Sequence, residues 1–353
     1  MHPNTITDML AIRYPIFQGP MGAGLSTPAL VAAVSEAGGL GGYGAYTLRP
    51  EEIHSLAADI RKLTAQPWNL NLWVSDVDDA LSTYTDADFD GVKALFGPVF
   101  VELGIPVPAP AISIESKFEV QAEAMLAVKP AVFSFVFGIP DKKILEECRR
   151  QGIVTAGAAT TLEEGLALEA ADVDVIVAAG FEAGGHRPSF LRRPEDSLTG
   201  VFTLTQQLAK SVRKPIVAAG GIADAAGVEA ALRLGASAVQ IGTAFLACEE
   251  SGATAPYRTR LFSPAARFTE LTRIYTGRLA RAVRTEMAGR FAGMECELAP
   301  FPLQSQLMAP VRQAALESGQ WEYSAVWAGQ AAGHLHHRHA AALMEELSAC
   351  WRK

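Results

Sequence analysis

The order of apolar and polar segments constrains the fold of this chain more than any other feature. From Pro15 onward, short apolar runs that end in glycine or small residues alternate eight times with amphipathic stretches. Such alternation is typical of repeated strand-helix units around a parallel sheet. The predicted strands are residues 15–21, 39–44, 68–74, 131–138, 153–158, 175–180, 215–220 and 238–244.

Helices are predicted after nearly every strand, over residues 28–37, 50–63, 141–150, 162–170, 203–212 and 225–234. Several open with Pro, Thr or Asp, which favour a helix N-terminus. Eight consecutive units, with glycines gathered at the carboxyl ends of strands, favour an α/β fold of the (β/α)8 TIM-barrel type. A doubly wound open sheet is the alternative.

Two segments do not fit the repeat. Residues 75–112 predict an insertion after the third strand that lies over the barrel mouth. Residues 257–353 are predicted to be mostly helical, with one helix through FTELTRIYTGRLARAVRTEMAGRF and a last helix from about Ser324. We therefore expect a barrel core over residues 1–256 and a helical extension over residues 257–353 that packs on the barrel and caps the site.

Composition and charge indicate a soluble enzyme. The 353 residues are 49% hydrophobic and 19% charged, with a net charge of -8. Nucleic acids and anionic membranes bind basic surfaces, so neither is an expected partner. No run approaches the roughly 18 apolar residues of a membrane span, and the first residues lack the basic start and apolar core of a signal peptide. The sequence predicts a cytoplasmic protein.

Cysteine and histidine positions predict no metal site. The four cysteines are far apart and include no C-x-x-C pair, which argues against a zinc site and a disulfide framework. The last predicted helix carries four histidines, which are His334, His336, His337 and His339. No carboxylate or cysteine joins them locally, so we expect a solvated helix face. The arginines of the extension are likewise expected at an exposed or inter-subunit surface; they are Arg278, Arg281, Arg284 and Arg290.

The segment VIVAAGFEAGGHRPSF, residues 175–190, has the composition of an active site. A strand buried on both faces is followed by Gly180, Gly184 and Gly185, which let a ligand approach the main chain. His186 stands where that strand has ended, and its imidazole titrates near neutral pH. The alternative is a glycine-rich turn with an incidental histidine.

Glycines end both of the last two predicted strands. The seventh runs into PIVAAGGIAD, with Gly220 and Gly221, and the eighth into AVQIGTAFL, with Gly242 and Thr243. In eight-stranded barrels, the loops after strands seven and eight often bind phosphate through backbone N–H groups. Two such ends together favour a phosphate site over tight turns alone.

The first and third strands end in residues suited to a flat ring such as isoalloxazine. Gly19 and Gly22 leave room for a ring against the backbone, and Met21 offers a polarisable contact. Asn71 is a polar side chain at the end of the third strand, suited to the edge of a flavin ring. An ordinary first strand and a turn asparagine are the alternatives.

The stretch GLGGYG, residues 39–44, matches the dinucleotide-binding pattern G-x-G-x-x-G. Its glycines lie within the predicted strand, whereas that pattern requires them in the turn that opens a helix. No acidic residue ends a strand about 20 residues later, so a Rossmann site is not predicted.

Several motifs, in the same order, resemble those of the nitronate monooxygenases, formerly called 2-nitropropane dioxygenases, which are FMN-dependent barrels. The resemblance covers nearly the whole chain and rests on PIFQGPMG, NLNLW, FSFVFGIP, the run from TLEEG to GGHRPSF, PIVAAGGIAD, VQIGTAFL and AVWAGQAAG. It implies that His186 is the catalytic residue. The FMN-binding residues that we expect are Gln18, Gly19, Pro20, Met21, Gly22, Asn71, Gly180, Gly184, Gly185, Ala219, Gly220, Gly221, Gln240, Gly242 and Thr243.

Three residues depart from the pattern of that family. Pro188 stands where the family usually has glycine, and proline removes an N–H donor and fixes φ. Val136 occupies a position where some members carry a histidine. Trp73 replaces a common phenylalanine and is a bulkier pocket wall. We therefore expect a substrate pocket shaped differently from the family pattern.

The implied reaction is the oxidation of an alkyl nitronate, or of a nitroalkane, by FMN and dioxygen to a carbonyl compound and nitrite. His186 would orient the anionic nitronate as a donor, or remove the α-proton of a neutral nitroalkane. Two alternatives are an FMN-dependent NAD(P)H enoyl-thioester reductase with a similar glycine-glycine-histidine turn, and a non-catalytic FMN- or phosphate-binding barrel. A homodimer is a further expectation.

Overall fold

Eight parallel strands form a barrel in the structure, a computed structural model that describes residues 5–109 and 116–351. Neighbouring strands follow the order β1-β9-β8-β6-β5-β4-β3-β2. The two ends of this order meet, because the Gln18 amide donates to the Leu40 carbonyl (2.9 Å) and the Leu40 amide donates to the Ile16 carbonyl (2.9 Å). All eight predicted strands are confirmed. They are β1 (Ile16–Gln18), β2 (Gly41–Gly44), β3 (Trp68–Trp73), β4 (Val132–Val136), β5 (Val154–Ala159), β6 (Val175–Ala179), β8 (Ile216–Ala219) and β9 (Ala238–Ile241).

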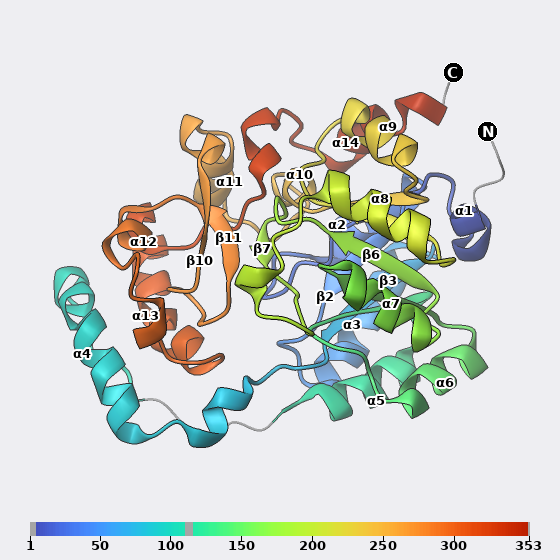
Figure 1. Cartoon of the computed structure of the whole chain (residues 1–353). Coiled ribbons are helices and arrows are strands. Elements are labelled where there is room, and N and C mark those ends of the chain that lie inside the picture. Colours follow the sequence, from blue (N-terminus) through green and yellow to red (C-terminus); the bar gives the residue numbers. More distant parts are fainter. Residues whose placement is uncertain (1–4, 110–115, 352–353) are drawn as a thin grey trace.

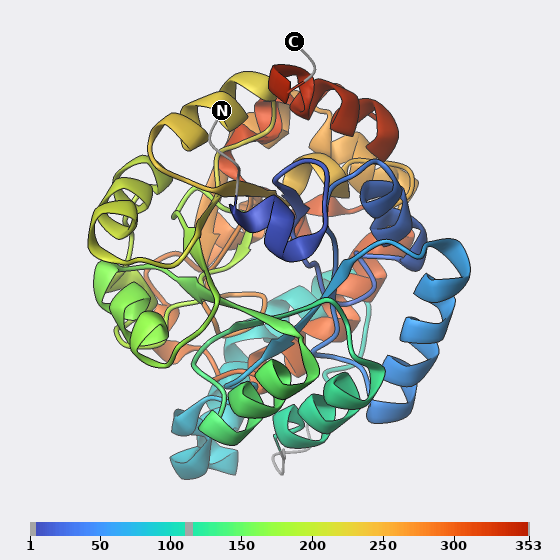
Figure 2. The same cartoon turned by 90° about the vertical axis from the view of Figure 1, so that its right-hand side faces the viewer.

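A helix follows every barrel strand, and the view along the barrel shows these helices as an outer ring (Figure 2). Thr27, Thr161 and Asp224 each cap a helix by accepting a hydrogen bond from its third amide. The predicted barrel helices are confirmed. The ring consists of α2 (Pro28–Glu36), α3 (Pro50–Leu63), α5 (Phe118–Val128), α6 (Lys142–Gln151), α7 (Leu162–Ala170), α8 (Val201–Ser211), α9 (Ala225–Arg233) and α10 (Thr243–Leu246).

Alternation along the strands separates the barrel interior from the layer beneath the helices. In β6, Val175 and Val177 belong to the interior apolar cluster, whereas Ile176 belongs to the cluster that packs against the helices. Helix α1 (Thr5–Leu10) adds Ile6 and Leu10 to the interior cluster at the amino ends of the strands, where Figure 2 shows it over the barrel. With that end filled, the carboxyl ends of the strands are left to form a site.

A second, antiparallel sheet lies beyond the carboxyl ends of the barrel strands (Figure 1). Its strands, in spatial order, are β10 (Thr269–Thr272), β11 (Ala280–Val283) and β7 (Gly185–His186). The pairing holds His186 opposite Ala280. The histidine therefore sits in a short strand, in place of the loop end that the sequence suggests.

The predicted helix over residues 268–291 is wrong for most of its length. Gly277 has a φ of 86°, which ends any regular element there. In addition, β11 pairs with β10 on one side and with β7 on the other, so this segment is a strand. Only α12 (Glu286–Arg290) is helical in this stretch. Two of its arginines, Arg278 and Arg281, are buried, in contrast to the exposed surface expected for them.

The last helix also begins later than predicted. Residues near Trp327 form a bridge to Ala282 and then a 3-10 turn, η6 (Gln330–His334), so that α14 spans Ala340–Leu347. The four histidines consequently end η6, follow it or cap α14, and they do not form a helix face. Helix α14 packs against α2, α9 and α10 on the outside of the barrel.

The predicted insertion leaves the barrel after β3. It forms η1 (Asp79–Thr83) and α4 (Asp86–Leu103), and residues 110–112 of the prediction lie outside the described residues. Figure 1 shows α4 beside α13 (Leu303–Ser318), and the two helices share an apolar cluster that contains Phe96 and Leu307. The insertion therefore packs on the extension. The remaining elements of the extension are α11 (Ala255–Leu261), η3 (Pro264–Arg267), η4 (Glu295–Glu297), η5 (Trp321–Tyr323) and η7 (Ala349–Trp351).

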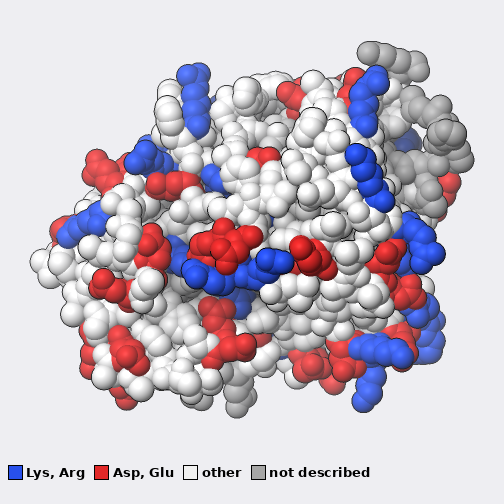
Figure 3. All heavy atoms as spheres, in the orientation of Figure 1, with Lys and Arg blue, Asp and Glu red and all other residues white. Residues whose placement is uncertain are grey.

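Acidic and basic side chains are interspersed over the face of the molecule shown in Figure 3. Across residues 5–109 and 116–351, no helix combines the length and the apolar character needed to cross a membrane.

Two buried charged residues anchor the segment that follows β7. Glu164 accepts hydrogen bonds from the amide (2.6 Å) and hydroxyl (2.6 Å) of Thr160 and from the amides of Phe190 (2.6 Å) and Leu191 (3.1 Å). Arg187 donates to the carbonyl oxygens of Ala179, Ser197 and Thr160. The fully buried carboxylate of Glu164 thus links α7 to the segment that follows His186 in the sequence.

Replacing Glu164 tests this anchor. Glu164→Ala removes a fully buried acceptor from four donors, and we expect it to lower the free energy of unfolding by about 3 kcal/mol. Its neighbour Glu163 is 55% exposed, forms an ion pair with the exposed Arg192 and interacts with the Thr161 hydroxyl, so Glu163→Ala is a matched control with a much smaller expected effect, below about 1 kcal/mol. Urea denaturation of both variants measures the difference. Equal losses would contradict the anchoring role.

Candidate active site

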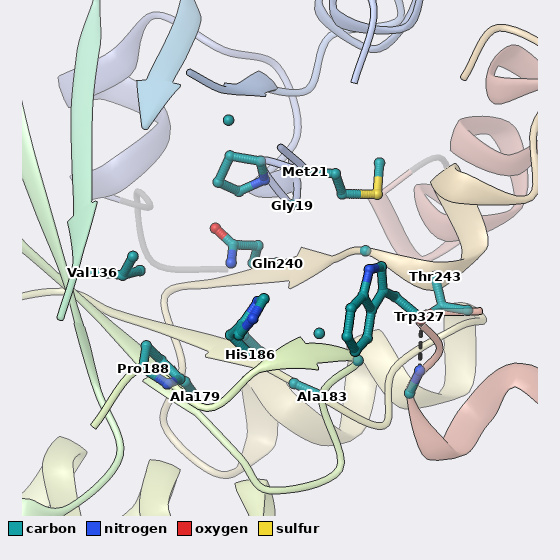
Figure 4. Close-up of a pocket in the computed structure, with 18 of the residues that line it drawn as sticks. Gly19, Met21, Val136, Ala179, Ala183, His186, Pro188, Gln240, Thr243 and Trp327 are labelled. Carbon is teal, nitrogen blue, oxygen red and sulfur yellow. Dashed lines mark hydrogen bonds between the residues drawn. The ribbon is translucent and has the colours of Figure 1, made fainter. Parts of the chain in front are cut away.

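A cavity of about 260 Å³ opens at the carboxyl ends of the barrel strands. Figure 4 shows Gly19 and Met21 on one side, His186 and Pro188 on the other, and Trp327 between them at one end. The predicted site residues that line it are Gly19, Pro20, Met21, Gly22, Asn71, Gly184, Gly185, His186, Ala219, Gly220, Gly221, Gln240, Gly242 and Thr243. The structure therefore brings together predicted residues from the ends of four barrel strands, β1, β3, β8 and β9, and from β7.

Two predicted site residues lie behind this lining. The side chain of Gln18 accepts from the Gly42 amide (2.8 Å) and donates to Ser26 (3.1 Å) and to the Gly19 carbonyl, so it holds the turn after β1. A Cβ atom on Gly180 would lie 2.3 Å from a carboxylate oxygen of Glu182, so this glycine is needed for packing. Neither residue is among those that line the cavity.

The glycines after β8 and β9 present main chain to the cavity. Gly220 and Gly221 have φ values of 117° and 69°, a region that favours glycine. A Cβ atom on Gly242 would meet nothing within 4 Å, so this strand end borders open space. Among the described residues, the amides of Gly220, Gly221 and Gly242 donate to no acceptor. Unpaired amides beside open space are what an anionic group requires.

The ends of the first and third strands form further parts of the cavity wall. A Cβ atom on Gly19 would lie 3.2 Å from the Cα of Gly242, so β1 and β9 approach closely at their ends. Asn71 is 4% exposed, lines the cavity and donates to the Ser134 hydroxyl (3.0 Å). This bond fixes the orientation of the Asn71 amide and leaves its oxygen for a bound molecule.

His186 is held by a hydrogen bond from the extension. Its Nε2 lies 2.9 Å from the hydroxyl of Thr276. That hydroxyl also lies 3.2 Å from the Arg278 carbonyl, to which it donates, and it accepts from the Arg278 amide. Because a hydroxyl has one hydrogen, Nε2 carries the proton and donates to Thr276. Within the described part of the chain, Nδ1 has no partner, so it is the nitrogen available to a bound molecule.

Aromatic rings surround the imidazole. The ring centroid of Trp73 lies 5.0 Å from that of His186, and the centroid of Trp327 lies 5.4 Å away. Phe137 and Phe301 lie further out, at 6.5 Å and 6.4 Å. The histidine thus contacts the cavity while most of its surroundings are apolar.

Burial in these surroundings, together with the positive charge of Arg278, lowers the pKa of His186 from 6.5 to about 3. The Arg278 guanidinium forms an ion pair with Asp78 (2.7 Å) and lies 4.3 Å from the ring centroid of Phe137. At neutral pH, His186 is therefore a neutral imidazole. A negative charge bound near Nδ1 would raise this pKa again.

The three residues that depart from the family pattern all line the cavity; they are Trp73, Val136 and Pro188.

Sequence reasoning missed two residues of the site, Thr276 and Tyr46. The ring of Tyr46 stacks on Trp73, with 3.8 Å between the ring centroids. Tyr46 lies two residues after the end of a predicted strand, which is an available signal. Thr276 carries no local signal, since it meets His186 across 90 positions of sequence.

The tautomer and charge of His186 are measurable by nitrogen NMR of histidine-labelled protein. We expect a neutral ring protonated on Nε2 from about pH 5 to 8, where an ordinary histidine titrates. Between pH 6.5 and 3 the unfolded chain binds a proton that the folded chain does not, so this residue lowers stability as the pH falls through that window. Thr276→Val should mix the tautomers and Thr276→Ser should not. A His186 resonance that titrates near 6.5 would contradict this.

Comparison with known proteins identifies the family of the chain. The family model described as nitronate monooxygenase matches residues 4–349. A nitronate monooxygenase of Paraburkholderia phytofirmans is 40% identical over 347 residues, which cover 96% of this chain and 92% of that protein. A solved nitroalkane oxidase from Streptomyces ansochromogenes is 33% identical, with a TM-score of 0.88 and coverage of 98% and 96%. FabK from Thermotoga maritima is 28% identical, with a TM-score of 0.75 and coverage of 99% and 96%. The chain therefore belongs to the nitronate monooxygenase family, whose members are flavin-dependent oxidoreductases.

Proposed function

We propose that this protein binds FMN and oxidises alkyl nitronates with dioxygen to a carbonyl compound and nitrite. The observation that carries the proposal is the position of His186, a neutral imidazole that faces the same cavity as the glycine ends of β8 and β9. A binding module has no need of such a group at its mouth. The family membership of the chain supports the same reaction.

The lining fits FMN at both ends. The unpaired amides of Gly220, Gly221 and Gly242 would hold the phosphate, and the turn from Gly19 to Gly22, with Asn71, would hold the ring. When bound, the flavin supplies the redox chemistry of the reaction. The residues of the chain then have to bind the substrate, orient it and exclude water.

His186 performs the proton and charge chemistry. Its Nδ1 accepts a proton from the α-carbon of a neutral nitroalkane, or, once protonated beside an anionic nitronate, donates a hydrogen bond to it. The bond to Thr276 keeps the ring in place in both cases. Trp73, Phe137 and Trp327 exclude water, which strengthens the interaction between the imidazole and the substrate anion.

His186→Ala separates cofactor binding from turnover. We expect the variant to retain FMN, because the phosphate and ring contacts lie on other strands, and to lose about 10²- to 10⁴-fold in nitronate turnover. Flavin absorbance measures cofactor content, and nitrite release in air from propionate 3-nitronate measures turnover. Retained flavin with unchanged turnover would remove the role assigned to His186.

The same assay, run without oxygen, tests the proposed function itself. A change of the flavin spectrum on addition of the nitronate, followed by nitrite when air is admitted, is the expected result. Rapid bleaching of the flavin by NADH or NADPH, with no response to nitronate, would favour the enoyl-thioester reductase. Bound flavin that responds to neither would favour the non-catalytic barrel.

Gly242→Leu tests the phosphate position. The φ of Gly242 is -101° and a Cβ atom there would meet nothing within 4 Å, so the free protein accepts a side chain at this position without backbone strain. The same side chain would occupy the proposed phosphate position, and we expect FMN to bind at least about tenfold more weakly. Gly91→Leu, at an exposed helix glycine with equally open surroundings, is the matched control. Unaltered FMN affinity in Gly242→Leu would place the phosphate elsewhere.

A further inference from the structure

The histidine-rich tract between η6 and α14 takes no part in the cavity, yet it gathers metal-binding groups. His336 Nε2 lies 2.8 Å from a carboxylate oxygen of Glu346, and His337 Nε2 contacts the same oxygen. The two imidazole centroids are 4.3 Å apart. One ligand atom from each of the three residues lies within 4.8 Å of the others. The carboxylate that the sequence did not supply locally is therefore supplied by the fold.

The local fold explains how these groups meet. Residues 335–338 fold back beside α14, whose first amide, that of Ala340, donates to the Glu250 carboxylate (3.1 Å). Glu346 lies in the last turn of α14. The backbone thus fixes the positions of both the histidines and Glu346. Only the ends of their side chains would have to move to bind an ion.

The hydrogen bonding of His336 prepares it as a ligand. Its Nδ1 lies 3.1 Å from the carbonyl oxygen of His334, so Nδ1 carries a hydrogen and donates it. Such a bond to a backbone carbonyl fixes the tautomer in which Nε2 holds a free electron pair for a metal ion. Without a metal, contact between Nε2 and Glu346 requires a second proton on the ring. A cation replaces that proton.

The donor set selects the kind of cation. Two imidazole nitrogens and one carboxylate oxygen suit Zn²⁺ and similar first-row ions, whereas Mg²⁺ and Ca²⁺ prefer oxygen ligands alone. Side-chain exposure is 58% for His336, 24% for His337 and 27% for Glu346, so an ion reaches the group from solution and keeps room for water as a fourth ligand.

We propose that His336, His337 and Glu346 bind one divalent transition-metal ion of the Zn²⁺ type on the outside of the barrel. The tract continues from Trp327, Gly329 and Ala331, which line the cavity. We call residues 327–339 the strap. The ion would link the strap to α14 and so stabilise the position of the strap. This inference does not depend on the proposed reaction or on FMN.

Calorimetric titration of the untagged, chelator-treated full chain with ZnCl₂ at neutral pH tests the site. We expect one ion per chain with a Kd on the order of 10 µM or tighter, and a higher melting temperature with zinc. Co²⁺ should bind competitively and give visible absorption bands typical of nitrogen and oxygen ligands. Excess Mg²⁺ should leave zinc binding unchanged.

Substitutions within the tract separate this site from general histidine binding. His336→Ala, His337→Ala and Glu346→Gln should each weaken zinc binding at least about tenfold. His334→Ala and His339→Ala are matched controls and should bind zinc as the parent does, since His339 instead lies 3.7 Å from Glu250. The melting temperature of each variant in chelator shows that it is folded. No binding to the parent chain, or binding that survives Glu346→Gln and is lost in His339→Ala, would overturn the proposal.

Discussion

The pairing of β7 with β11 is the interaction on which the site depends. Five residues separate the end of β6 from β7, and without this pairing they would run into a free glycine-rich loop. Instead, the ladder places His186 opposite Ala280, and the Arg187 amide donates to the Leu279 carbonyl (2.8 Å). Glu164 and Arg187 then fix the chain that follows. A sheet outside the barrel thus positions the imidazole of His186 at the cavity, so that a defined geometry is obtained next to a glycine-rich segment.

The electrostatics of the site follow from this placement. The segment that leads into β11 contains Thr276 and Arg278, and β11 itself pairs with His186. Arg278 is buried behind the rings of Phe137 and Phe301, and its guanidinium forms an ion pair with Asp78. The cavity consequently combines a neutral base with a positive charge beyond apolar walls. Such a combination favours an anionic ligand over a cationic one without a direct ion pair.

The parts that the sequence predicts are those whose signal is local. Each barrel strand is a short apolar run, and each glycine end is adjacent to its strand, so periodicity and turn residues are sufficient to find them. The parts it misses depend on distant partners. Thr269–Thr272 and Ala280–Val283 pair with each other and β11 also pairs with the distant β7, while Thr276 and Glu346 acquire their neighbours through tertiary contacts. The homodimer, the cytoplasmic location and the division at residue 256 stay predictions.

The cavity wall joins segments from near both ends of the sequence. The turn after β1 and the strap that contains Trp327 and Gly329 line the same space, and the Gly329 amide donates to the Thr243 hydroxyl (2.9 Å), as the dashed line in Figure 4 marks. During synthesis, β1 leaves the ribosome long before that strap exists. The cavity wall is therefore complete only when nearly the whole chain has been synthesised, and a molecule whose binding needs both segments would bind after synthesis of the barrel.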